Sequence, residues 1–107
     1  MAKFKIEFIN RVAAIEFSKL DGSSHLFVEK AFRKLEFRAD EIGKPLSNTP
    51  FALLHGCKEI KLKRLGIRII VRIINGQAQI VQIISINKRE NEHVFRIASE
   101  RLNKRSE

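Results

Sequence analysis

The chain of 107 residues has no tryptophan or tyrosine, one cysteine and two prolines. Its single cysteine, Cys57, excludes an internal disulfide framework and favours a reducing cytoplasm. No apolar run reaches the length of a membrane-spanning helix, because Arg68 and Arg72 interrupt the longest one. The first residues lack the charged-then-apolar layout of a secretory signal peptide. We therefore expect a cytoplasmic protein with one modest core, forming a single domain over residues 1–107 without membrane contact.

Motifs for several kinds of chemistry are also missing. The sequence contains no glycine-rich phosphate loop and no Ser/His/Asp arrangement. His55 and Cys57 flank Gly56, but without a further cysteine pair they do not indicate a zinc site. We expect neither a metal nor another cofactor.

Positive charge is abundant and unevenly placed. The net charge is +9, with 21 lysines and arginines against 12 acidic residues. Residues 1–43 carry eight basic and seven acidic side chains, whereas residues 44–107 carry thirteen and five. Such one-sided charge is typical of a surface that binds nucleic acid or an acidic protein, although a merely soluble basic surface is the plain alternative.

The apolar pattern predicts an α+β fold. Alternation over residues 3–8 indicates a half-buried strand. Two helices follow, the first capped by Asn10 and ended by Asp21-Gly22, and the second beginning at Ser23 or Ser24 and carrying a regular apolar stripe. After a loop at residues 43–57, strands are expected at 58–64, 67–74 and 78–86, and Asn87 caps a last helix. The order is β-α-α-β-β-β-α, a mainly antiparallel sheet packed by helices on one face.

Asn75-Gly76 lies between two segments of alternating apolar residues. Both residues tolerate the positive φ angles of a type I′ turn, so the pair predicts a tight hairpin between the second and third of these strands.

Charged side chains occur at strand positions in this region. Glu59, Lys61 and Lys63 share one face of their strand, opposite Ile60 and Leu62, and Arg68 lies on the next strand. Antiparallel pairing brings such side chains within reach of one another. Several cations beside a carboxylate could cleave RNA, because a base would accept the 2′-hydroxyl proton and the cations would stabilise the phosphorane. Equally, these residues could be solvated edge-strand charges that discourage aggregation.

The stretch from Gly56 to Arg105 resembles the RelE toxins of the RelE/ParE superfamily. The matching pieces are Leu54-x-Gly56, the lysine-rich strand, Gly66-x-Arg68-Ile, the Ile-Ser-Ile block at 84–86, Lys88-Arg-Glu, Val94-Phe95 and Ala98-x-x-Arg101-Leu. The resemblance implies an endoribonuclease that cuts messenger RNA in the ribosomal A site. It also implies a cognate antitoxin partner in a toxin–antitoxin hetero-oligomer.

The resemblance further assigns roles to individual residues. It implies that Lys61 is a catalytic lysine, Arg68 the transition-state arginine and Arg89 an assistant to leaving-group departure or phosphate binding. Glu59 stands where a lysine is usual, and Phe95 stands where a catalytic tyrosine is usual. Since Phe95 cannot transfer a proton, Glu59 is the expected base, with Lys61 and His93 as alternatives. Phe95 either stacks on a base or fills the core. RNA contacts are expected from the following residues: Lys58, Lys63, Arg64, Lys88, His93 and Phe95.

Two other functions share this fold pattern. One is a ParE-like poison of DNA gyrase, which has no need of cations converging on a phosphate. The other is a non-catalytic member that binds only RNA or its antitoxin, an interpretation that Phe95 keeps open.

Overall fold

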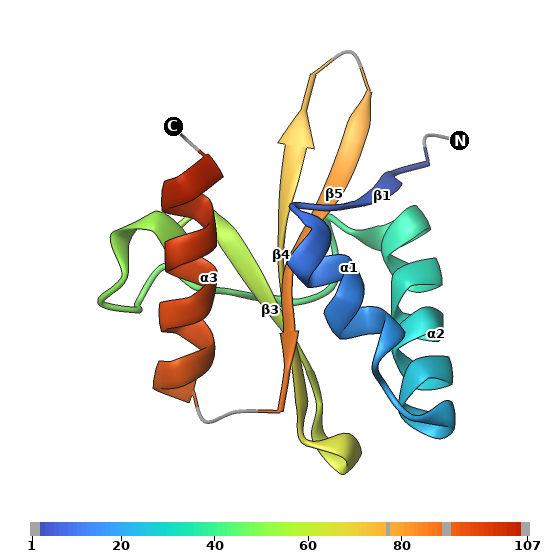
Figure 1. Ribbon diagram of the computed structural model, residues 1–107. Helices are drawn as coiled ribbons and strands as arrows, with labels where there is room; N and C mark the ends of the chain where they lie inside the picture. Colours follow the sequence, from blue (N-terminus) through green and yellow to red (C-terminus); the bar gives the residue numbers. More distant parts are fainter. Residues whose placement is uncertain (1–2, 77, 89–90, 106–107) are drawn as a thin grey trace.

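The computed structural model describes residues 3–76, 78–88 and 91–105 (Figure 1). Its elements follow in the order β1 (Lys5–Phe8), α1 (Arg11–Ser18), α2 (Gly22–Arg38), β2 (Lys44–Pro45), η1 (Ala52–Leu54), β3 (Cys57–Leu62), η2 (Lys63–Leu65), β4 (Ile67–Asn75), β5 (Gln79–Asn87) and α3 (Asn91–Arg105). The predicted β-α-α-β-β-β-α order is confirmed. A two-residue strand and two short 3-10 helices, η1 and η2, were not predicted.

The five strands form one sheet in the order β1-β5-β4-β3-β2. β1 runs parallel to β5, and all the other neighbouring pairs are antiparallel. β4 and β5 are therefore central, with a β-bulge in their pairing between Ile70 and Val71.

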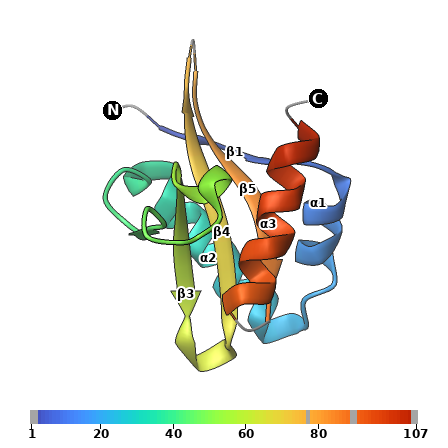
Figure 2. The same ribbon diagram turned by 90° about the vertical axis from the view of Figure 1, so that its left-hand side faces the viewer.

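Helices cover both faces of this sheet, which corrects the expectation of a single covered face. α2 packs against one face through a core that includes Leu35, Ile69 and Ile83. α3 packs against the other through Ile70, Ile84 and Val94, and Figures 1 and 2 show these helices on opposite sides of the sheet. Both faces are covered because the central strands have nearly continuous apolar runs, which are typical of strands buried on both faces.

The helix starts follow local capping chemistry. Asn10 caps α1 as predicted, since its side-chain oxygen accepts the Ala13 N–H at 2.9 Å. Asp21 was expected to end the first helix, but it caps α2 by accepting the Ser24 N–H at 3.0 Å. This hydrogen bond lowers the pKa of Asp21. α2 consequently begins before Ser23.

The β4–β5 hairpin is confirmed, but its predicted turn type is wrong. The last pair in the β4–β5 register is Asn75 with Gln79. Neither Asn75 nor Gly76 has a positive φ angle, which a type I′ turn requires. Among the described residues, positive φ angles occur at Gly43 and Gly66, and at Gly66, where φ is 66°, the chain leaves η2 to enter β4.

The start of the last helix also differs from the prediction. Asn87 is the final residue of β5, so it does not cap α3, which begins at Asn91. Because β5 extends to its pairing with Arg68, Asn87 is held in the sheet. Within the described residues, no helix is both long and apolar enough to cross a membrane.

Candidate active site

The candidate site lies on the side of β3 and β4 that faces α3. Cys57 and Ile70 belong to the core beneath α3. Strand alternation therefore places Glu59, Lys61 and Arg68 on the same face. Lys61 is directly opposite Arg68 in the β3–β4 register. The predicted convergence of these three side chains is observed.

Glu59 is buried between two cations. Its Oε2 accepts a hydrogen bond from Arg68 Nη1 at 2.7 Å, and its Oε1 lies 3.9 Å from Lys61 Nζ. The Glu59 side chain is only 3% exposed, against 22% for Arg68 and 37% for Lys61. The alternative interpretation of Glu59 as a solvated edge-strand charge is therefore wrong, since the side chain is buried and β3 has a neighbouring strand on each side. Burial of a carboxylate is tolerated here because two positive groups compensate its charge.

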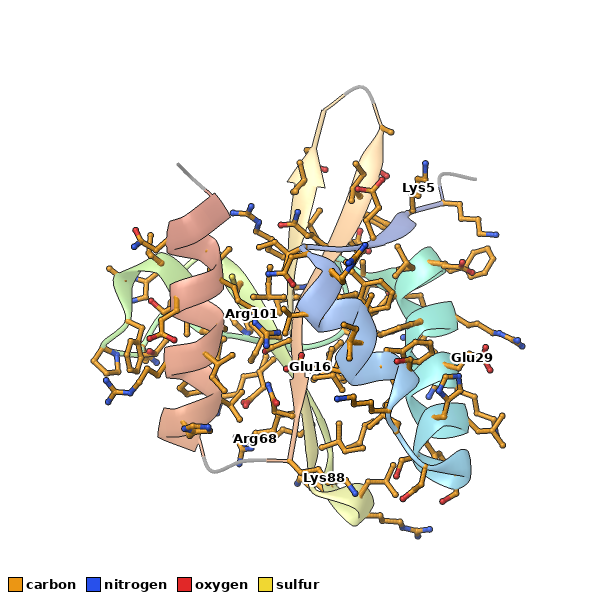
Figure 3. The ribbon with its side chains drawn as sticks, viewed as in Figure 1. Lys5, Glu16, Glu29, Arg68, Lys88 and Arg101 are labelled. Atoms are coloured by element: carbon orange, nitrogen blue, oxygen red, sulfur yellow. The ribbon has the colours of Figure 1, made fainter. Side chains whose placement is uncertain are left out.

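Two hollows meet at Lys61. The first, which we call the cationic hollow, has a volume of about 400 Å³. It is lined by Lys61, Leu62, Lys63, Gly66, Ile67, Arg68 and Lys88. Its four basic side chains come from β3, η2, β4 and the residue that follows β5. Figure 3 shows Arg68 and Lys88 at the same end of the sheet. An anionic group such as a phosphate fits this lining.

The second hollow, the aromatic hollow, has a volume of about 300 Å³. Its lining comprises Lys44, Pro45, Leu46, Asn48, Thr49, Pro50, Glu59, Lys61 and Phe95. Phe95 is half-buried and also packs against the core beneath α3. The two interpretations of Phe95, core filling and base stacking, are therefore compatible in this geometry.

Other predicted site residues are placed differently. Lys63 and Lys88 line the cationic hollow, whereas Arg64 lies on η2 beside a separate hollow. His93 is exposed in the first turns of α3 and lines neither hollow described above. Arg89 lies outside the described residues.

Lys58 lies on the opposite face of β3 and has a structural partner. Its Nζ donates to the backbone oxygens of Ala39 at 2.8 Å and Ile42 at 3.1 Å. These carbonyls follow the C-terminus of α2, where a positive charge is favourable. Along the strand, Lys58 alternates with Glu59 and lies on the same face as Ile60 and Leu62. The sequence therefore already indicated that Lys58 and Glu59 lie on opposite faces.

Sequence reasoning missed Lys44 and the loop that follows it. Lys44 pairs with Glu59 in the β2–β3 register and lines the aromatic hollow. A two-residue strand that ends in Pro45 has no detectable alternation, so no pattern could have indicated it.

Sequence reasoning also missed the contact that holds α3, and with it Phe95, in place. Arg101 of α3 makes two hydrogen bonds to Glu16 of α1, at 2.7 and 2.6 Å. Arg101 also donates to the Ile84 carbonyl at 2.9 Å, and Glu16 accepts the Ile86 N–H at 3.1 Å. Figure 3 shows Glu16 and Arg101 approaching each other from the two helices. These bonds join both helices to the part of β5 that does not pair with β1.

Groups suited to other chemistry are sparse in the part of the chain that the structure describes. No three His, Cys, Asp or Glu side chains there gather as metal ligands would. Cys57 is buried, and this burial raises the pKa of its thiol to about 11 although Arg72 opposes the shift. Such a thiol is a poor nucleophile at neutral pH.

Comparison with known proteins identifies sequence and structural relatives. No family model matches the sequence. Over 56 residues the chain is 38% identical to an Escherichia coli protein described as a RelE-like toxin. This match covers 50% of the chain and 58% of that relative, so the chain spans little more than half the relative's length.

Similarity to solved structures extends over most of the chain. A doubly substituted form of E. coli toxin RelE in the free state superposes with a TM-score of 0.73 at 26% identity, covering 94% of this chain and 98% of that one. The toxin–antitoxin complex RelBE2 of Mycobacterium tuberculosis gives 0.63 at 25% identity, with 85% and 97% covered. The intact E. coli RelBE complex gives 0.63 at 25% identity, with 84% and 100% covered. The resemblance to RelE predicted from the sequence is thus confirmed, and the chain has the RelE fold.

Proposed function

We propose that this protein is the toxin of a type II toxin–antitoxin module and acts as a ribosome-dependent messenger RNA endoribonuclease in the cytoplasm. The observation that carries the proposal is the pairing of Lys61 with Arg68 above the buried Glu59, at the point where the two hollows meet. The RelE fold and the solved toxin–antitoxin complexes among its relatives support the toxin assignment and the antitoxin partner.

The proposed reaction needs no metal ion. The scissile phosphate sits beside Arg68 and Lys61, whose charges stabilise the phosphorane as the 2′-oxygen attacks. Lys63 and Lys88 bind the neighbouring phosphate in the cationic hollow. Arg89 would assist departure of the 5′-oxygen, as the family resemblance suggests.

Proton transfer falls to Glu59 in this proposal. Its Oε2 is engaged by Arg68, but its Oε1 is 3.9 Å from Lys61 and has no hydrogen-bond partner of its own among the described contacts. Glu59 also lines the aromatic hollow, where Phe95 could hold a base by stacking. The 2′-hydroxyl of that nucleotide could then reach Oε1.

The test is a reconstituted translation reaction with a defined message, followed by mapping of the cut sites. We expect cuts within the codon in the A site when ribosomes are present and far slower cutting of the same RNA alone. A DNA gyrase supercoiling assay run in parallel tests the ParE-like alternative. Gyrase inhibition without message cleavage would overturn the proposal, and so would binding of RNA or antitoxin with neither activity.

A further inference from the structure

A third hollow lies beside the candidate active site, between α2 and the β3–η2 corner. Its volume is about 510 Å³, and we call it the apolar hollow. Phe27, Leu62 and Leu65 provide its apolar surface, and Lys61, Lys63 and Arg64 complete its lining. The start of α2 and η2 lie at the same end of the molecule in Figure 1.

Phe27 is half exposed although it lies beside other apolar side chains. It is 50% exposed on α2, and its ring has Lys30 Nζ at 5.5 Å from the centroid. Single exposed apolar residues need no explanation, but apolar residues that gather around a hollow with a polar rim are typical of interaction sites. Phe27 therefore indicates a docking surface.

The rim of this hollow has one sign of charge. Lys61, Lys63 and Arg64 lie on it, and no acidic side chain of the described residues contributes to its lining. A complementary occupant would place an apolar group on Phe27 and Leu65 and carboxylates against the rim. That combination is found in an acidic amphipathic peptide segment.

A nucleobase fits this lining less well. The uncharged side chains of the hollow, Phe27, Leu62 and Leu65, offer no hydrogen-bonding groups. The cations on the rim only donate hydrogen bonds, so a base in the hollow would find no side-chain acceptor for its own N–H groups, and burying such groups unpaired is costly. An aliphatic or aromatic side chain of a peptide has no polar groups that would be left unpaired there.

Lys61 lines the apolar, cationic and aromatic hollows alike. We propose that the apolar hollow is the anchor site for an acidic amphipathic segment of the antitoxin, whose carboxylates engage Lys61 and so withdraw it from the reaction. This inference rests on the proposed function, which supplies both the antitoxin as partner and RNA cleavage as the reaction that is inhibited.

Binding is measured first, by fluorescence anisotropy. The probe is a labelled nonapeptide of glutamates with leucines at three positions of one helical face, and its control carries serines in place of those leucines. Phe27→Ser should weaken probe binding about tenfold, as expected for loss of one buried aromatic contact. Phe37→Ser is the matched control, because Phe37 is 55% exposed on the same helix with Lys3 Nζ 5.4 Å from its ring centroid. We expect that variant to bind within about twofold of the unsubstituted protein.

The same proteins then enter the cleavage assay. The leucine peptide should inhibit message cleavage by the unsubstituted protein and fail to inhibit Phe27→Ser, which should itself cut normally. Equal binding by the Phe27 and Phe37 variants would overturn the inference. So would a loss of affinity for an oligouridylate, but not for the peptide, in Phe27→Ser, which would assign the hollow to RNA. A protein that binds the peptide through Phe27 but cuts no message would refute the proposed function and leave the anchor site standing.

Discussion

Glu59 and Arg68 are neighbours on adjacent strands, and each constrains the other. Arg68 compensates the charge of a carboxylate that is almost fully buried, and the carboxylate in turn holds the guanidinium at 2.7 Å. Removing Arg68 would leave the buried Glu59 with only the more distant Lys61, and removing Glu59 would leave two cations without their carboxylate, so complete truncation would mix effects on stability with effects on catalysis. Conservative replacements keep the packing, and Arg68→Lys also keeps the charge.

Arg68→Lys is the informative change at the arginine. Lysine keeps the positive charge near Glu59, but a compact ammonium cannot bridge the carboxylate and a phosphate as a guanidinium does. We expect message cleavage to fall by about two orders of magnitude, in the range seen for loss of one oxyanion donor. The measurement is the single-turnover rate on ribosomes. Arg72→Lys, on the same strand but hydrogen-bonded to Gln82, should cut at nearly the normal rate. An equal loss in both variants would indicate a general disturbance of β4.

Glu59→Gln preserves shape and removes the capacity to accept a proton. We expect cleavage to fall by about two orders of magnitude, as is usual for loss of a general base. The measurement is again the single-turnover rate, with binding of an uncleavable 2′-O-methyl RNA as the control for positioning. Normal cleavage by Glu59→Gln would move the base to Lys61 or His93.

Phe95 belongs to the same question, because it occupies the expected place of a tyrosine. Phe95→Leu should weaken RNA binding more than it slows the chemical step, since it removes a stacking surface but no ionisable group. A sharp rise in rate for Phe95→Tyr would contradict the role proposed for Glu59 and indicate an enzyme that has lost its original proton-transfer group.

At the scale of elements, apolar periodicity was the most reliable guide. Val28, Ala31, Phe32 and Leu35 of the α2 stripe are buried as predicted, because a three-and-four spacing leaves a helix only one face to bury. The last two members of the predicted stripe, Ala39 and Ile42, lie beyond the end of α2 at Arg38. The two-sided burial of the sheet was missed, although the consecutive apolar residues of β4 and β5 imply it. Strand alternation correctly grouped Glu59 with Lys61, but their pairing with β4 and the depth of Glu59 depend on long-range packing, which no local pattern contains.

The contact between Glu16 and Arg101 illustrates such long-range packing. The two residues are 85 positions apart in sequence, and their side chains are only 19% and 12% exposed. Each also binds backbone of β5, so the pair holds α1 and α3 against the same strand.

Breaking this pair should destabilise the protein. Arg101→Met leaves Glu16 without its cation, and we expect the free energy of unfolding to fall by about 3 kcal/mol, as for other ion pairs shielded from water. Urea denaturation measures the change. Glu41→Gln, which breaks the exposed pair with Arg38, should cost less than about 1 kcal/mol. Similar losses in the two variants would mean that the Glu16–Arg101 pair is no more than a surface contact.

At the scale of the whole molecule, charge separates two regions with different tasks. Residues 1–43 carry a net charge of +1 and provide β1, α1 and α2, while residues 44–107 carry +8 and provide the whole lining of the cationic and aromatic hollows. The first region supplies one edge strand and two helices that pack on the sheet, and the second presents cations from β3, η2 and β4 to one area. The charge asymmetry could be predicted from the sequence, but the grouping of the cations around Lys61 could be seen only in the folded structure.

This asymmetry predicts how RNA binding depends on salt. If Lys61, Lys63, Arg68 and Lys88 each neutralise a phosphate, the logarithm of the affinity for uncleavable single-stranded RNA should fall with the logarithm of salt concentration with a slope of about −3. Lys88→Ala should make that slope shallower by about 0.7, because one released counterion is lost. Arg33→Ala removes an equal charge from the exposed side of α2 and should leave the slope unchanged. Titrations at four salt concentrations measure all three slopes. If Arg33→Ala changes the slope as much as Lys88→Ala, RNA is attracted by net charge alone, and the cationic hollow has no special part in binding it.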